Sequence, residues 1–285
     1  MVLHLPSRPT ALPPPVAAPE GSRPSPRAAV RWLAGGALLA FVTSWVGTTV
    51  LGLQHDVFYL VYFTLALGYL GWFGSRSGVV WREVLRRHAW WSVAVGVLVG
   101  LAVVRQVLGQ AGTPHPDGAY FGFELVWRGL VYGTVDALIL YAFPAVVAHL
   151  VLRGNRRGVA RKLGYAGLVV ALSLLVSASY HAGYSTYRGE EMAKPLIGTV
   201  LMDAPAVLTG NPVGSVVAHA AVHTTAVVHQ FEGGGNHFLP PELTSDYPDR
   251  PGGWAASALA AGWLVLLGAV VALNRDRLRT AWGRR

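Results

Sequence analysis

Apolar segments of about 20 residues recur along almost the whole chain, and they leave little room for any other kind of structure. A helix of that length spans the roughly 30 Å hydrocarbon core of a bilayer. Of the 285 residues, 53% are hydrophobic and only 13% are charged, whereas about 25% are charged in typical soluble domains. The sequence therefore predicts an all-α, polytopic membrane protein and excludes a water-soluble enzyme, a coiled coil and a secreted disulfide scaffold.

About eight transmembrane helices fit these segments. We expect them at 32–53, 57–74, 89–110, 119–152, 164–187, 192–209, 212–230 and 254–274. The fourth exceeds one crossing, so we expect it to tilt or to begin with an interfacial turn, with Pro144 permitting a kink.

The spans divide the chain into regions. Residues 1–31 hold eight of the 18 prolines, a composition typical of a disordered tail. The predicted regions are a Pro/Arg-rich cytoplasmic tail at 1–31, three transmembrane helices within 32–110, a motif-bearing transmembrane domain at 117–230, an extracytoplasmic loop at 231–253, and a last transmembrane helix with a basic cytoplasmic tail at 254–285.

Basic and acidic connections alternate along the chain. Of the 23 Lys and Arg residues, 18 lie in 1–31, 75–88, 153–163 and after 274. Cytoplasmic loops carry such an excess, so we expect a multi-pass protein of the cell membrane with both termini cytoplasmic. The net charge of +9 is then a topology signal rather than a basic patch for nucleic acid. Membrane lipid is an expected partner, and nucleic acid is not.

Five ionisable side chains lie at similar depth in the predicted spans. A charge in hydrocarbon costs at least ~2.5–3.5 kcal/mol, so such residues are functional candidates. Glu124 and Arg128 are four residues apart on one helix face, as are His219 and His223. Counting 1.5 Å per residue from the outer helix ends places these four and His181 in the outer half of the membrane. We expect them to converge in one polar cavity.

Other ionisable residues of the spans have simpler interpretations. Arg105, His149 and His229 lie near span ends, where long side chains reach the interface. Asp136 and Asp203 lie deeper, and each is as consistent with helix packing as with a site.

Three short motifs include the five candidates. Phe121–Gly129 reads FGFELVWRG, Ser177–His181 reads SASYH, and Gly210–Pro212 reads GNP ahead of HAAVH at His219–His223. In this order they resemble the CPBP family, the CAAX prenyl endopeptidase and bacteriocin-processing or immunity group, which includes lysostaphin-resistance-like intramembrane peptidases. The resemblance covers about residues 117–230.

The resemblance implies a membrane peptidase in which a Glu and a His activate water while a second His and its Asn partner stabilise the oxyanion. The matching positions are Glu124 for the second glutamate of the first motif, Arg128 for its arginine, His181 for the water-activating imidazole, His219 for the oxyanion donor and His223 for the Asn. Phe123 stands in place of the first glutamate, so we expect Glu124 to have taken over the role of base.

The expected function is therefore an intramembrane endopeptidase that hydrolyses a peptide bond in a membrane-anchored or lipidated protein or peptide. Peptide hydrolysis requires a base within about 2.6–3.2 Å of water and a donor for the oxyanion. Glu124 with His181 would supply the first, and His219 with His223 the second. The chain has no cysteine, which excludes a thiolate nucleophile, and no cofactor is expected.

Three alternatives remain. The substitutions at Phe123 and Ser177 suggest a catalytically impaired relative that acts by binding, as an immunity or maturation partner. A metal-dependent hydrolase would use zinc-type ligands at His181, His219, His223 and Glu124. A proton-coupled transporter would use the same side chains as a proton relay.

The topology is testable because the chain is free of cysteine. With Ser245→Cys in the acidic loop, we expect reaction with a membrane-impermeant thiol reagent in intact cells. With Arg157→Cys in a basic connection, we expect protection until the membrane is permeabilised. The reverse labelling pattern would contradict the predicted orientation.

Overall fold

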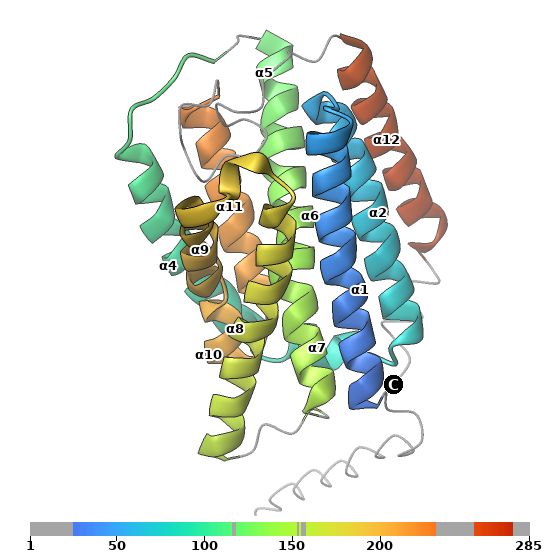
Figure 1. Cartoon of the computed structure of the whole chain (residues 1–285), viewed down its shortest axis with the longest axis vertical. Coiled ribbons are helices and arrows are strands. Elements are labelled where there is room, and N and C mark those ends of the chain that lie inside the picture. The colour runs from blue at the N-terminus through green and yellow to red at the C-terminus, as the bar shows by residue number, and fades with distance from the viewer. Residues whose placement is uncertain (1–24, 116–117, 153, 155–157, 232–253, 276–285) are drawn as a thin grey trace, which may run out of the picture.

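A computed structural model describes residues 25–115, 118–152, 154, 158–231 and 254–275. Its regular elements within these ranges are helices packed side by side in a bundle (Figure 1). The α-helices are α1 (Pro26–Ser44), α2 (His55–Arg76), α3 (Trp81–Arg86), α4 (Ala89–Leu108), α5 (Gly118–Glu124), α6 (Tyr132–Ala137), α7 (Phe143–Val151), α8 (Val159–Ala182), α9 (Ala193–Met202), α10 (Ala204–Thr209), α11 (Val213–His229) and α12 (Trp254–Leu273).

Six helical stretches are long and apolar enough to cross a membrane. They are Pro26–Val50, His55–Arg76, Ala89–Leu108, Gly118–Val151, Val159–Ala182 and Ala256–Leu273. The all-helical prediction is confirmed, and these stretches are those of a multi-pass membrane protein. The remaining core helices are shorter: α9 has 10 residues, α10 has 6 and α11 has 17.

The first helix begins earlier than the sequence predicts. The Ser25 hydroxyl accepts a hydrogen bond from the backbone N–H of Ala28 at 3.2 Å, and Pro26 occupies the first turn. Both are typical helix-starting features. Residues 26–31 of the predicted tail are therefore helical. The rest of that tail, residues 232–253 of the predicted extracytoplasmic loop and residues 276–285 of the predicted basic tail lie outside the described part of the chain.

The predicted fourth span is one helical stretch from Gly118 to Val151 with two wide-turned π-helical segments, Leu125–Val131 and Leu138–Ala142. A proline inside a helix crowds the carbonyl four residues before it. For Pro144 that carbonyl belongs to Leu140, which lies in the second π-helical segment. The widened turn accommodates the proline while the helix continues.

Two other predicted spans have different boundaries. The fifth, α8, ends at Ala182 instead of 187, and two short 3₁₀ turns follow it at Ser185–Tyr187 and Gly189–Met192. The sixth is interrupted at Asp203, between α9 and α10. Pro205 has no backbone N–H to continue the hydrogen-bonding pattern of α9.

Helix α11 packs between α4 and the long helix that contains α6. Glycines allow these backbones to approach closely, as in many membrane helix pairs. A Cβ atom on Gly214 would lie 1.8 Å from the carbonyl oxygen of Ser92 in α4, and one on Gly133 would lie 2.9 Å from the Cα atom of Ala220. The position of α11 is therefore fixed from both sides by backbone contact.

This packing predicts that Gly133→Ala destabilises the protein. The added methyl group must displace the α11 backbone, and overpacking of this kind costs roughly 1–3 kcal/mol. Thermal unfolding of the purified protein in detergent should show a lower Tm. Gly68→Ala is the matched control, because a Cβ atom on Gly68 meets nothing within 4 Å. Equal Tm values for the two variants would contradict the packing.

Candidate functional site

A carboxylate and two imidazoles lie together inside the bundle. The Nε2 atom of His219 in α11 lies 3.0 Å from the Oδ2 atom of Asp136 in α6, and the rings of His219 and His223 are 4.3 Å apart. Asp136 is 3% exposed, His219 8% and His223 6%. Because Nε2 of His219 donates to the carboxylate, Nδ1 of the neutral ring remains an acceptor.

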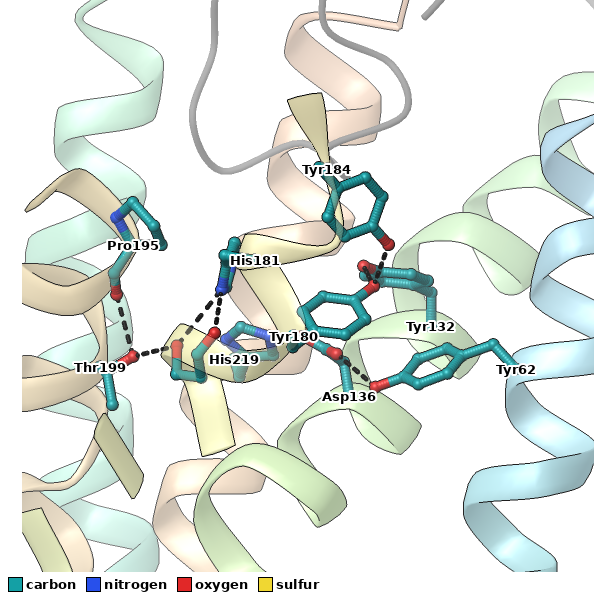
Figure 2. Close-up of polar contacts among 10 residues, drawn as sticks. Tyr62, Tyr132, Asp136, Tyr180, His181, Tyr184, Pro195, Thr199 and His219 are labelled. Atoms are coloured by element: carbon teal, nitrogen blue, oxygen red, sulfur yellow. Dashed lines mark hydrogen bonds and ion pairs between the residues drawn. The ribbon is translucent and has the colours of Figure 1, made fainter. Parts of the chain in front are cut away.

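Asp136 is itself held by a third helix. The hydroxyl group of Tyr62 in α2 donates to the Oδ1 atom of Asp136 at 2.8 Å (Figure 2). Each carboxylate oxygen thus has a donor, and the carboxylate fixes both the orientation and the tautomer of His219. A base oriented by a carboxylate is a recurring arrangement in hydrolytic sites.

His181 reaches the same place from the end of α8. Its Nδ1 atom donates to the backbone carbonyl of Ser177 at 2.8 Å, which leaves Nε2 as the acceptor. The Ser177 hydroxyl accepts from Thr199 of α9 at 2.8 Å. His181 lies within electrostatic reach of Asp136 and His219, and Figure 2 shows the three side chains converging from different helices. Asp136, His181, His219 and His223 are termed the histidine cluster below.

Tyrosines enclose the histidine cluster. The hydroxyl groups of Tyr132 and Tyr180 are 2.6 Å apart, and Tyr184 donates to Tyr180 at 2.7 Å (Figure 2). The Tyr132 ring lies 5.1 Å from the His223 ring, and the Tyr141 ring lies 5.0 Å from the His219 ring. Aromatic walls of this kind lower the local dielectric and strengthen polar interactions inside them.

Glu124 and Arg128 belong to a separate group. Arg128 forms an ion pair with Glu124 and contacts His55, whose Nε2 atom lies 3.3 Å from the Oδ1 atom of Asp56. The Arg128 guanidinium also lies over the Phe231 ring, 5.0 Å from its centroid. These four charged or ionisable residues, His55, Asp56, Glu124 and Arg128, are all buried and are termed the arginine cluster below.

The two clusters occupy different levels of the long helix. Glu124 and Asp136 are 12 residues apart, which is about 18 Å along a helix. Helix α11 runs antiparallel to the long helix, with Thr224 against Gly129 and Ala220 against Gly133. The five candidates therefore do not all lie in one cavity, as the sequence had led us to expect. His181, His219 and His223 lie together, whereas Glu124 and Arg128 lie in the arginine cluster.

Phe123 lies in aromatic packing beside the arginine cluster. Its ring stacks on the Trp127 ring with a centroid separation of 6.2 Å and an interplanar angle of 20°. The position that resembles the first glutamate of the family motif is therefore apolar both in residue type and in surroundings.

From the sequence, Asp136 had two interpretations, and Tyr62 was not singled out. An acid within a span was the signal for Asp136, and its hydrogen bond to His219 assigns it to the histidine cluster. Asp203, the other deep acid, accepts from Ser173 of α8 at 2.9 Å, as a helix-packing contact would. His229 lies at the end of α11 with Nε2 2.8 Å from the carbonyl of Gln110.

Two groups of side chains have the donor atoms to hold a metal ion. Asp136, His219 and His223 offer ligand atoms within 4.8 Å of one another, and so do His55, Asp56 and Glu124. The zinc set expected from the sequence was His181, His219, His223 and Glu124. In the group that the structure forms, Asp136 takes the place of Glu124, and His181 is not a member. In the second group the Arg128 cation already pairs with Glu124, so the histidine cluster is the better candidate.

Comparison with known proteins gives no match to this chain among family models, curated proteins or solved structures. Functional inference therefore depends on the geometry of the two clusters.

The arginine cluster predicts a large stability effect. Glu124→Gln leaves the buried Arg128 cation without its carboxylate, and breaking a buried pair costs roughly 3–5 kcal/mol. The double variant Glu124→Gln with Arg128→Met removes both charges and should recover part of the loss, because the buried Asp56 also loses a nearby cation. Thermal unfolding of the two variants in detergent tests this. If the double variant is as unstable as the single one, the pair does not act as a structural unit.

Proposed function

We propose that the chain is an intramembrane endopeptidase in which the histidine cluster activates water against a peptide bond of a membrane-anchored or lipidated substrate. The observation that carries this proposal is the contact between His219 Nε2 and Asp136 Oδ2 in the bundle interior. A buried acid and imidazole are costly among apolar helices, and such groups mark functional sites.

The chemistry assigns one role to each imidazole. His219 Nδ1 takes a proton from water while the water oxygen bonds to the peptide carbonyl carbon, and Asp136 stabilises the imidazolium. The same proton passes to the amide nitrogen as the C–N bond breaks, which yields an acid and an amine. His223 has a buried Nδ1 atom without a hydrogen-bond partner among the described residues, and it serves as donor to the oxyanion. His181, oriented by Ser177, positions the water.

The resemblance to the CPBP family supports the same reaction class. Its three motifs fall on the long helix, α8 and α11 in that order, and the second and third motifs supply His181, His219 and His223. Asp136, three turns further along the same helix, takes the acidic role that the sequence suggested for Glu124. Arg128 then stabilises the fold together with Glu124 instead of contacting substrate.

We further propose that α9–α10 and α11 complete eight membrane crossings, with both termini on the cytoplasmic side of the cell membrane. The alternation of basic and acidic connections supports this orientation. In the bundle, α1 and α8 begin at the end where α7 finishes (Figure 1), as alternate crossings require.

Cleavage of membrane-peptide libraries by the purified protein, followed by mass spectrometry, tests the proposal. Asp136→Asn and His219→Gln should each reduce turnover by about 10²–10⁴-fold, because a positioned general base contributes that much. His229→Gln is the matched control, since it removes a histidine of the same helix outside the cluster. An inert wild type would support the binding-partner alternative, and full activity of His219→Gln would refute the catalytic role.

Metal-dependent hydrolysis is the second candidate, because Asp136, His219 and His223 form a two-histidine, one-carboxylate set. We expect that no tightly held transition metal is required, since the carboxylate and His219 already hydrogen-bond to each other. Metal analysis of the purified protein separates the two cases. Stoichiometric zinc that is lost in both His219→Ala and His223→Ala would overturn our choice.

A further inference from the structure

A second polar site lies far from the histidine cluster, where the beginnings of α4 and α8 meet the end of α10. It is a pocket of about 300 Å³. Its lining is formed by Arg87, His88, Trp91, Lys162, Tyr165 and residues 207–210. Lys162 and His181 are 19 residues apart on α8, which is about 28 Å along the helix. The pocket is therefore independent of the proposed catalytic site.

The pocket combines cations with aromatic and apolar groups. Arg87 and Lys162 come from the two basic connections, 75–88 and 153–163, so two separate parts of the chain bring positive charge to one cavity. None of the lining residues is acidic. Arg and Lys bind phosphate oxygens through charge-assisted hydrogen bonds. The charge of the pocket thus matches an anion.

The chain segment that carries Arg87 is fixed in position. The Asn211 side-chain amide donates to the backbone carbonyls of Leu85 at 2.8 Å and Arg87 at 2.9 Å. The same side chain accepts from the backbone N–H of Val213 at 2.9 Å at the start of α11. The segment before α4 is thereby joined to the α10–α11 connection, so Arg87 is held at the pocket wall.

The surroundings indicate a lipid ligand rather than a soluble anion. Trp91 is 70% exposed and Leu208 is 71% exposed on the outside of an apolar bundle, where acyl chains would lie against them. Tryptophan is enriched at the headgroup level of membranes. A volume of about 300 Å³ is at the lower end of ligand-pocket volumes, suited to a headgroup with its tails outside.

We propose that this pocket binds the phosphate-bearing headgroup of an anionic phospholipid. Arg87 and Lys162 contact the phosphate, and Trp91 and Leu208 contact the first part of the acyl chains. Basic pockets between transmembrane helices on the cytoplasmic side are suited to such lipids.

Native mass spectrometry of the full chain in detergent tests this proposal with three probes: phosphatidylglycerol, phosphatidylcholine and inorganic phosphate. One phosphatidylglycerol should be retained per chain in preference to phosphatidylcholine. Arg87→Gln and Lys162→Gln should each weaken retention about fivefold, which corresponds to roughly 1 kcal/mol per cation. Arg86→Gln removes a neighbouring cation that does not line the pocket and should leave retention unchanged.

Three results would overturn the proposal. Equal retention of both phospholipids would exclude headgroup recognition. An equal loss in Arg86→Gln would indicate general attraction of anionic lipid to a basic surface. Saturable binding of inorganic phosphate that phosphatidylglycerol does not displace would identify a soluble anion as the ligand. Lys162→Arg, which keeps the charge and should keep retention, controls for loss of folding.

Discussion

The close approach of α11 to the helices on both sides of it determines the rest of the architecture. Gly133 contacts the α11 backbone from the long helix, and Gly214 on α11 contacts the carbonyl of Ser92 in α4. Because no side chains separate these backbones, α11 lies close to the long helix. At this short distance the His219 side chain of α11 reaches the Asp136 carboxylate of the long helix directly. This hydrogen bond gives a partner to the His219 N–H and to the Asp136 carboxylate. Buried polar groups in a membrane interior need such partners, because lipid and apolar side chains provide none.

The two buried clusters differ in what surrounds their charges. In the arginine cluster, Glu124 and Arg128 of the long helix pair with each other at 0% and 1% exposure. The contact between Arg128 and His55 joins the long helix to the start of α2. In the histidine cluster, a single carboxylate faces three imidazoles, and these rings retain acceptor atoms after their internal hydrogen bonds are made. A pair whose charges are matched stabilises the fold, whereas imidazoles with remaining acceptors can also exchange protons.

Much of the helical framework could be predicted from the sequence, because the length of each apolar segment can be compared with the length of one membrane crossing. The pairing of His219 with His223 was predictable for a similar reason, since four residues along a helix return to one face. The partner of His219 was not predictable, because residues 62, 136 and 219 are joined by no local pattern. Counting depth from the helix ends also placed Glu124 beside the histidines, and this count assumed that the helix ends are level. They are not, because α8 ends at Ala182, and this end lies below the first turns of α5 (Figure 1).

The hydrogen bond to Asp136 holds His219 in one tautomer inside the bundle. Nitrogen chemical shifts of the histidine rings, measured by solid-state NMR in lipid bilayers and assigned with His219→Gln, test it most directly. We expect that neutral His219 carries its proton on Nε2 in the wild type and loses this preference in Asp136→Asn. Neutral His219 protonated on Nδ1, or shifts that do not change in Asp136→Asn, would contradict it.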